Sequence, residues 1–355
     1  MAGERGQRPG GRRHWWLAAV GALLVGAAIF AATRRGEVRP REILHLTGTT
    51  MATTYSVKVV GPGFAPADRG RLTLAVEREL ERVNAAMSRY REGSDLDRLN
   101  RSRSEAAQPI PADLAEILGL ARSISELSNG AYDVTVGPLV RLWGFDDESR
   151  LAVAPAPEAL AAARERVGFG KLEIDPSGPT ARKLHPELDI DLSSIAKGWG
   201  VDRVALALEA SGQRDYLVEI GGEVRAAGRN HRGEPWRVGV EQPLADRREV
   251  FEVAALSGMS MATSGDYRNF YVLDGRQVSH TIDPRTGRPV EHGLASVTVL
   301  DPSCARADGL ATALTVLGPV LGPALADREG LAALFLIRRD DGTFERRATA
   351  AFDGR

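Results

Sequence analysis

Cysteine is almost absent from this chain of 355 residues, which contains Cys304 alone. A single cysteine cannot form an intramolecular disulfide, and it excludes a metal site built from several thiolates. No haem-attachment motif is present, which argues against a cytochrome-like electron carrier. The fold must therefore be held by its core, and 43% hydrophobic residues in a chain of this length suffice for one large domain or two moderate ones.

An excess of charge of one sign is also lacking. The formal net charge is −1, and no long basic run occurs outside the N-terminus. Proteins that bind nucleic acid present basic patches to the phosphate backbone. We therefore expect no nucleic-acid partner.

The N-terminus has the pattern of a targeting segment. An apolar run at residues 15–32 lies between Arg12-Arg13 and Arg34-Arg35. This length is at the lower limit for a membrane-spanning helix, and a cleaved signal peptide is the alternative. The basic flank keeps the N-terminal end in the cytoplasm in either case.

The domain expectation follows from this segment. We expect residues 1–36 to form the targeting or transmembrane segment and residues 37–355 to form one domain. That domain would face the periplasm or the outside of the cell, either anchored in the inner membrane or exported after cleavage. No cysteine lies near residue 30, which excludes a lipoprotein anchor.

Hydrophobic periodicity predicts helices and strands along the rest of the chain. The expected helices are 69–87, 112–128, 154–167 and a helix that Ser193 or Ser194 caps and that ends near 210. The expected strands are 50–60, 188–192, 216–220, 236–241, 251–256, 270–273, 295–300 and 332–338, after a polar connector at 36–46. Helices mixed with mostly adjacent strands favour an α+β fold over a doubly wound sheet.

One pair of oxygen-bearing side chains suggests a cation site. Asp308 and Thr312 lie four residues apart in an apolar helical pattern, so they share one face of a helix. Two oxygen ligands on one face suit a hard cation such as Mg²⁺. A cation near a histidine-containing loop is suited to phosphoryl chemistry, because the metal absorbs developing negative charge.

A second segment, DIDLSSIAKGWGVD at 189–202, combines an acid, two serines and a lysine. A helix that begins after Asp191 would offer free amides to a phosphate, and Lys197 in its first turn would add positive charge. The alternative is a strand, turn and helix with a surface lysine. The pattern supports both interpretations equally.

Two further segments carry candidate residues. In GAYDVTVGPLVRLWGF (130–145), Tyr132 and Asp133 could belong to a loop that grips a planar heterocycle, although composition alone favours a loop entering a core helix. In HTIDPRTG (280–287), His280 could be a general base, a ligand-holding group or a structural histidine. The sequence does not choose between His280 and Asp283 as proton acceptor.

Eight segments occur in the order in which one known family carries them. They are MATTY (51–55), MSRYREGSDLDRLN (87–100), GAYDVTVGPLVRLWGF, DIDLSSIAKGWGVD, EIGGEVRAAG (219–228), ATSGDYRNF (262–270), HTIDPRTGRPV (280–290) and ADGLATAL (307–314). As a set they resemble the ApbE family of FAD:protein FMN transferases, from about residue 45 to residue 320.

The resemblance implies a fold and a reaction. The fold would be T-fold-like, with an antiparallel sheet and helices packed on one side. The reaction would be Mg²⁺-dependent transfer of FMN from FAD to a threonine or serine hydroxyl of an acceptor protein, with release of AMP. The partners would be FAD, the acceptor protein and, through the N-terminal segment, a membrane.

The resemblance also implies residue roles. The cation ligands would be Ser194 (through its carbonyl), Asp308 and Thr312. FAD contacts would come from Met51, Tyr90, Ala131, Tyr132, Asp133, Asp191, Lys197 and the backbone near Ile282. His280 would have a catalytic or ligand-positioning role. Ala52 departs from the family pattern, in which glycine follows the residue at Met51.

Two other functions are compatible with these residues. With water in place of the acceptor hydroxyl, the protein would be a Mg²⁺-dependent FAD pyrophosphatase that produces FMN and AMP. A flavin-binding protein without turnover is the third possibility. The metal pair Asp308 and Thr312 and the histidine His280 argue against it, because storage of a flavin requires no metal site.

Overall fold

The structure is a computed structural model that describes Gly3 and residues 41–146, 151–175, 177–267, 269–273 and 275–354. The apolar run at 15–32 and the domain boundary expected at 36/37 lie outside the described residues. The segment Glu42–Arg355 forms one compact unit. The fold is described from this unit alone.

An eight-stranded sheet runs through the unit, and each neighbouring pair of its strands is antiparallel. The strands lie side by side in their order along the chain. They are β1 (Glu42–Thr50), β2 (Thr53–Gly61), β6 (Tyr216–Ile220), β7 (Glu223–Ala227), β10 (Met259–Gly265), β15 (Leu294–Asp301), β16 (Ala332–Arg338) and β17 (Phe344–Ala348). An antiparallel sheet accompanied by helices confirms the expected α+β class.

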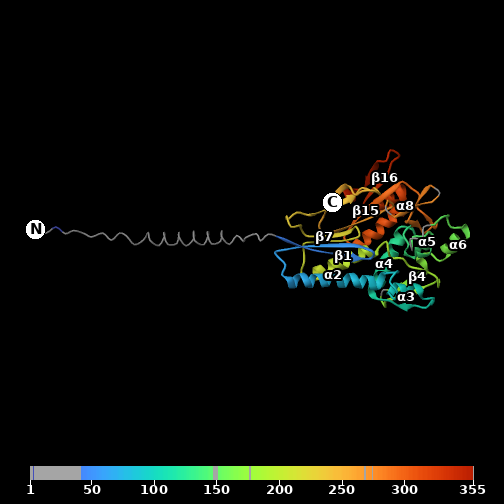
Figure 1. Ribbon diagram of the computed structural model, residues 1–355, viewed down its shortest axis with the longest axis horizontal. Coiled ribbons are helices and arrows are strands. Elements are labelled where there is room, and N and C mark those ends of the chain that lie inside the picture. The colour runs from blue at the N-terminus through green and yellow to red at the C-terminus, as the bar shows by residue number, and fades with distance from the viewer. Residues whose placement is uncertain are drawn as a thin grey trace. The chain divides into compact units, whose positions relative to one another are not determined.

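The remaining elements are inserted between these strands or follow them (Figure 1). The helices are α2 (Pro66–Met87), α3 (Asp95–Arg101), α4 (Ala112–Leu127), α5 (Gly137–Leu142), α6 (Pro157–Glu165), α7 (Ala196–Ala210), α8 (Cys304–Arg328) and α9 (Ala350–Asp353), with single 3-10 turns at Val134–Val136 and Phe169–Lys171. The short strands are β3 (Gln108–Pro109), β4 (Leu172–Asp175), β5 (Thr180–Lys183), β8 (Trp236–Glu241), β9 (Val250–Leu256), β11 (Phe270–Leu273), β12 (Arg276–Ser279), β13 (Ile282–Asp283) and β14 (Arg288–Pro289).

The two faces of the main sheet are covered differently, as strand β16 shows. Successive side chains of a strand point to opposite faces. Phe335 belongs to the core cluster that contains Leu314 of α8, whereas Leu334 belongs to the cluster that contains Trp236 of β8 and Phe352 of α9. The long helices α2, α7 and α8 therefore lie on one face, as expected, and the β8–β9 hairpin and the short α9 cover the other.

Helix α8 is long and apolar enough to cross a membrane by length and composition, but it is a core helix. Two-thirds of its most apolar window, 67%, is buried inside the protein. It packs against β10 and β15, and non-helical backbone at Gly318 kinks it. Its apolar character therefore reflects the core of the described unit.

The strand expected at 188–192 is wrong. The segment alternates apolar and acidic residues in sequence, but Asp191 is buried along with Leu188, Ile190 and Leu192, and the backbone of the segment pairs with no strand. The Asp191 amide donates to the Val134 carbonyl at 2.7 Å, and the Ile190 amide donates to Asn100 Oδ1 at 2.8 Å. The alternation of apolar and acidic residues occurs in the sequence alone, so the pattern could not distinguish a strand from an extended segment buried among other elements.

The serine cap expected for α7 is also wrong. The N-cap residue is Ile195, and no side chain caps this end of the helix. The Ser193 hydroxyl donates to Asp191 Oδ1 at 2.5 Å, and the Ser194 hydroxyl donates to the Tyr132 hydroxyl at 3.2 Å. Both serines therefore stabilise the loop before the helix.

The start of the domain differs from the expected connector and single strand. Residues 42–50 form the edge strand β1 in full register with β2, and the chain turns between them at Met51 and Ala52. Both turn residues have left-handed backbone, with φ of 48° and 56°. This is the two-residue hairpin that favours glycine, and at Ala52 it costs about 1–2 kcal/mol.

Candidate active site

The candidate site lies where the first turns of α7 and α8 meet. A Cβ added to Gly198 would lie 2.7 Å from the Cys304 carbonyl carbon, so the two backbones are in direct contact. Asp202, one turn further along α7, accepts the Cys304 amide at 3.0 Å and the Ala305 amide at 3.1 Å. A glycine and a carboxylate of α7 thus fix the start of α8.

Asp308 is one turn further into α8 and points back to α7. Its Oδ2 accepts the Gly198 amide at 3.1 Å, and its side chain is buried. Burial raises the pKa of this carboxyl, while Lys197 and the Gly198 amide lower it. Gly198 is the third residue of α7, so its amide has no acceptor within the helix, and Asp308 supplies one while the Ser194 carbonyl before the helix does not receive this amide.

These residues form an oxygen donor set for a hard cation. Thr312 follows Asp308 by one helical turn, and the Ser194 carbonyl lies in the loop that leads into α7. No group of three or more His, Cys, Asp or Glu side chains that could hold a metal occurs among the residues that the structure describes. A cation here would therefore depend on one carboxylate, one hydroxyl and a backbone carbonyl, which are ligands of the type that Mg²⁺ accepts.

Lys197 lies between two buried carboxylates. Its Nζ is 2.8 Å from Glu223 Oε1 and 3.9 Å from Asp308 Oδ1. Burial lowers the pKa of Lys197, but the two carboxylates outweigh it and raise the pKa above its ordinary value. The lysine is therefore a fixed cation and not the surface lysine of the alternative interpretation.

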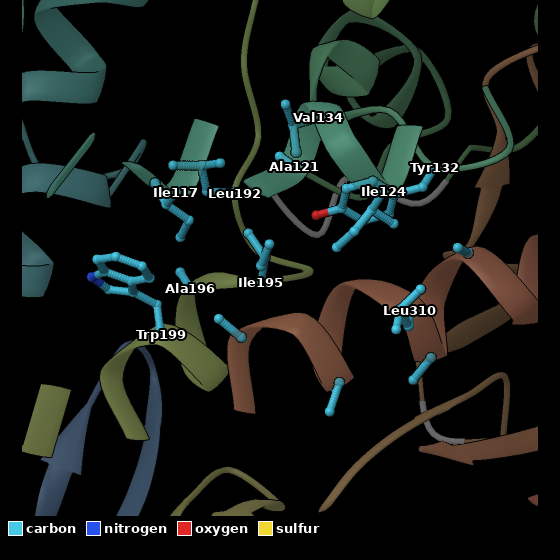
Figure 2. Close-up of a cluster of buried hydrophobic side chains, with 14 of the residues drawn as sticks. Ile117, Ala121, Ile124, Tyr132, Val134, Leu192, Ile195, Ala196, Trp199 and Leu310 are labelled. Atoms are coloured by element: carbon cyan, nitrogen blue, oxygen red, sulfur yellow. The ribbon is translucent and has the colours of Figure 1, made fainter. Parts of the chain in front are cut away.

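Tyr132 connects this junction to the rest of the core. Its ring belongs to the cluster shown in Figure 2, together with Ile195 before α7 and Leu310 of α8. Its hydroxyl receives the hydrogen bond from Ser194, and burial raises its pKa. A buried tyrosine hydroxyl thus holds Ser194 in place.

Asp191 and Tyr90 meet at a buried arginine. Arg89 Nη1 is 2.7 Å from Asp191, and Nη2 is 3.1 Å from Asp189 and 3.4 Å from Asp146. The Arg89 side chain is only 6% exposed, whereas the neighbouring Tyr90 is 66% exposed. The arginine fixes the Asp191 carboxylate and leaves an aromatic ring beside it open to a planar ligand.

Ala131 and Asp133 flank Tyr132 in a buried loop. Asp133 Oδ1 accepts the Thr135 amide at 2.8 Å and its hydroxyl at 2.7 Å, and Oδ2 accepts the Phe169 amide at 2.7 Å. Burial raises the pKa of Asp133, and these hydrogen bonds lower it. Both carboxylate oxygens are therefore occupied in holding the loop.

His280 is held by a backbone carbonyl. Its Nδ1 is 2.9 Å from the Asn269 carbonyl oxygen, which can only accept, so the neutral ring carries its proton on Nδ1. Burial lowers the pKa of His280, the charge of Lys197 lowers it further, and the Asn269 bond opposes both. The imidazole is thus neutral near pH 7, with the Nε2 lone pair available as a base.

Asp283 has a different environment from His280. Its carboxylate accepts Arg285 Nε at 2.9 Å and Nη2 at 2.8 Å, and it also accepts the Arg285 amide. Ile282 is buried in the cluster that contains Trp143, whose Nε1 donates to the Gly287 carbonyl at 2.8 Å. The loop is thereby fixed to the 130–145 segment, and Asp283 is engaged within it.

Met51 reaches the site from the β1–β2 turn. A Cβ added to Gly200 of α7 would lie 2.9 Å from the Met51 Cε, and the side chain packs against the core clusters on both sides of α7. Met51, Tyr132, Ser194, Lys197 and Asp308 are thus brought to the α7–α8 junction, and Thr312 follows Asp308 by one turn of α8. Asp191 and Tyr90 lie at the Arg89 node, and His280 approaches from the later insertion.

Sequence reasoning assigned no role to Arg89, Asp202, Glu223 or Asn269. Asn269 acts through its backbone, so its side-chain chemistry held no signal. For Glu223 the sequence did contain a signal, the segment Ile220-Gly-Gly-Glu223. Its tight turn makes Glu223 the cross-strand partner of Ile220. Cross-strand partners share a face, and Ile220 lies in the cluster that faces α2 and α7.

The fold and this site define an α+β protein with a buried lysine–carboxylate centre between two helix starts. The chain belongs to the ApbE family, whose profile matches residues 51–335. It is 45% identical over 338 residues to the FAD:protein FMN transferase of Vibrio cholerae serotype O1, which covers 95% of this chain and 97% of that protein. It is 42% identical over 337 residues to the FAD:protein FMN transferase of Haemophilus influenzae, and the match covers 94% of this chain and 96% of that protein.

Solved structures show the same similarity. The flavin transferase ApbE from Vibrio cholerae aligns with a TM-score of 0.81 at 44% identity, over 89% of this chain and 99% of that chain. The apo form of the Pseudomonas stutzeri flavinyl transferase ApbE aligns with a TM-score of 0.81 at 43% identity, over 90% and 98%. The family resemblance seen in the sequence is confirmed.

Proposed function

We propose that this protein transfers FMN from FAD to a threonine or serine hydroxyl of an acceptor protein and releases AMP. Relatives at 35–45% identity over most of the chain carry the name FAD:protein FMN transferase, which supports the reaction. The observation that carries the proposal is the α7–α8 junction, where Asp308 lies 3.9 Å from Lys197 and one turn before Thr312. Such a centre suits a reaction at a pyrophosphate.

The residues fit a divalent cation, and we propose Mg²⁺. Asp308, Thr312 and the Ser194 carbonyl would hold it, because they supply oxygen donors and the Gly198 amide does not occupy that carbonyl. When bound, Mg²⁺ supplies charge neutralisation at the phosphates. Lys197 adds a fixed positive charge from the protein itself.

The transfer is a displacement at phosphorus, in which one P–O bond forms and one breaks. The acceptor hydroxyl oxygen forms a bond to the phosphorus on the riboflavin side of FAD, and the bond from that phosphorus to the bridging oxygen breaks. AMP leaves with the electron pair. His280 Nε2 takes the hydroxyl proton, because its Nδ1 proton is already committed to the Asn269 carbonyl. Asp283 is the weaker candidate for this base because it is paired with Arg285.

The flavin half of FAD would contact the Arg89 node and the loop around Tyr132. The exposed ring of Tyr90 offers a stacking surface, and Asp191 beside it offers hydrogen-bond acceptors. Met51, Ala131 and the backbone near Ile282 would complete the contacts, and Asp133 would contribute by holding the loop. This assignment is supported by the fixed positions of these residues.

A mass measurement separates transfer from hydrolysis. The protein is incubated with FAD and Mg²⁺, first alone and then with an acceptor peptide that contains a threonine. Transfer predicts a gain of the FMN mass on the peptide and AMP release that requires the peptide. Release of FMN and AMP at the same rate without peptide would identify a pyrophosphatase, and neither product would indicate flavin binding alone.

We also propose that residues 37–355 act in the periplasm or outside the cell, held to the inner membrane by the N-terminal segment or released after its cleavage. The support is the apolar run at 15–32 with basic residues on both sides. The acceptor would then be a protein exposed on the same side of the membrane.

A further inference from the structure

Glu223 is a buried carboxylate with a single partner group. Its side chain is 4% exposed, and its Oε1 lies 2.8 Å from Lys197 Nζ. Its other oxygen, Oε2, is buried with no hydrogen-bond partner. Burial raises the pKa of Glu223, and Lys197 lowers it. A buried carboxylate with one oxygen that lacks a hydrogen-bond partner destabilises the folded state. We therefore look for a functional role of Glu223 beside Lys197.

Glu223 reaches Lys197 from the sheet, whereas Asp308 reaches it from α8. Glu223 follows the Gly221-Gly222 turn, whose φ values are 60° and 107°, and begins β7 on the sheet face that α7 covers. Asp308 reaches the same ammonium from α8 at a longer distance, 3.9 Å against 2.8 Å. Lys197 is therefore held closer to the sheet than to the candidate metal ligand.

We propose that Glu223 is a positioning residue that holds the Lys197 ammonium off Asp308, so that the Asp308 carboxylate stays open to a divalent cation. This inference rests on the proposed function, because it takes Asp308 as the metal ligand. Without a charged Glu223, the nearest anion for Lys197 is Asp308, and the lysine becomes an internal competitor for the metal.

The net charge around Lys197 also supports a role of Glu223 in cation binding. When both carboxylates are ionised, which for Glu223 requires a pH above its raised pKa of about 7, Asp308, Glu223 and Lys197 carry a net charge of −1, and neutralising Glu223 brings this charge to zero. A unit charge several ångströms from a divalent ion in a partly buried site changes its affinity by roughly tenfold or more. Loss of the Glu223 charge should therefore weaken the metal site even though Glu223 is not a ligand.

The test is the affinity of the full-length protein for Mn²⁺, which is measured from the decrease in the EPR signal of free Mn²⁺. We expect Glu223→Gln, which keeps an acceptor oxygen in place, to bind Mn²⁺ roughly tenfold more weakly than the wild type. Lys197→Met should bind at least as tightly as the wild type. The double variant should return close to wild-type affinity, because the competitor is gone.

The controls separate this inference from the metal assignment. Asp308→Asn should lose the site, and cooperative thermal unfolding shows that each variant is folded. If the wild type binds Mn²⁺ and Glu223→Gln binds equally well, or if the double variant binds as weakly as Glu223→Gln, the positioning role is overturned while the metal site stands.

If Lys197→Met binds more weakly than the wild type, competition by the lysine is overturned even where Glu223→Gln does not fold. If the wild type binds no Mn²⁺ at all, the metal assignment fails, and this inference fails with it.

Discussion

The Gly198 amide donates to Oδ2 of Asp308 at 3.1 Å, although the two residues are 110 positions apart in the chain. This one bond sets the first turn of α7 against the first turns of α8. It brings the loop carbonyl of Ser194 and the ammonium of Lys197 to the side chain of Asp308. The candidate site is thus a product of how two helices cross.

The crossing predicts a strong effect of Gly198→Ala. The new methyl carbon would lie 2.7 Å from the Cys304 carbonyl carbon and 2.8 Å from the Ala305 Cα, and backbone atoms cannot move aside as a side chain would. We expect a loss of about 1–3 kcal/mol in the free energy of unfolding, measured by urea denaturation, and a large loss of FMN transfer.

Gly119→Ala is the matched control for that substitution. Gly119 is exposed within α4, and no heavy atom lies within 4 Å of its added Cβ. The same change there should raise the free energy of unfolding by about 0.5–1 kcal/mol and leave transfer unchanged. Equal stability of Gly198→Ala and the wild type would show that the helices do not cross as described.

The sequence predicted the elements better than their connections. Local patterns were sufficient for α2 and α4, which each have an apolar face that their own residues define, and for β16, which is a short apolar run buried on both faces. The segment 188–192 was misassigned because its amide groups bond to Val134 and Asn100, which are far away in the chain. Long-range hydrogen bonds leave no local periodicity.

The site shows the same limit. Asp308 and Thr312 could be paired from their spacing because both lie on one helix. The ion pair of Lys197 with Glu223 and the node of Arg89 with Asp191 join separate elements. The family resemblance brought most of these residues together without distances, and the supporting residues Arg89 and Glu223 emerged only in three dimensions.

Arg89→Gln tests the node that holds Asp191 and Tyr90. Removing the arginine leaves three carboxylates close together and partly buried, and breaking such a buried pair costs about 3–5 kcal/mol. We expect a lower thermal midpoint and weaker FAD binding, measured by flavin fluorescence.

Arg141→Gln provides the comparison, because Arg141 also pairs with Asp189 and Asp146 but its side chain is 56% exposed. An exposed ion pair contributes about 0–1 kcal/mol, so the thermal midpoint and FAD affinity should change little. Similar losses for the two variants would contradict a special role of Arg89.

His280 predicts a pH dependence. Its pKa lies below the ordinary value, so the imidazole stays neutral as pH falls from 8 to about 6.5. At saturating FAD and saturating Mg²⁺ the transfer rate should be flat over that range and should fall at lower pH, where protonation removes the Nε2 lone pair. His280→Ala should still bind FAD but transfer FMN about 10²–10⁴-fold more slowly, without that low-pH decline. Lost FAD affinity with near-normal turnover at saturation would make His280 a binding residue and would favour Asp283 as the base.

The proposed location predicts where a fused reporter is active. Alkaline phosphatase joined after Arg355 should be active in cells, because it requires an oxidising compartment to form its disulfides. The same fusion without residues 1–36 should be inactive and cytoplasmic. Activity confined to the cytoplasm, measured with a reporter that folds there, would contradict export of residues 37–355.

The most direct test of the account is FMN transfer by Asp308→Asn. Asparagine keeps the size of the side chain and an oxygen that can accept the Gly198 amide, but it removes the charge that would bind Mg²⁺. Mass spectrometry of the acceptor peptide after incubation with FAD and Mg²⁺ should show the added FMN with the wild type and none with the folded variant. Equal FMN addition by both proteins at ordinary Mg²⁺ would contradict the metal-dependent transfer centre between α7 and α8.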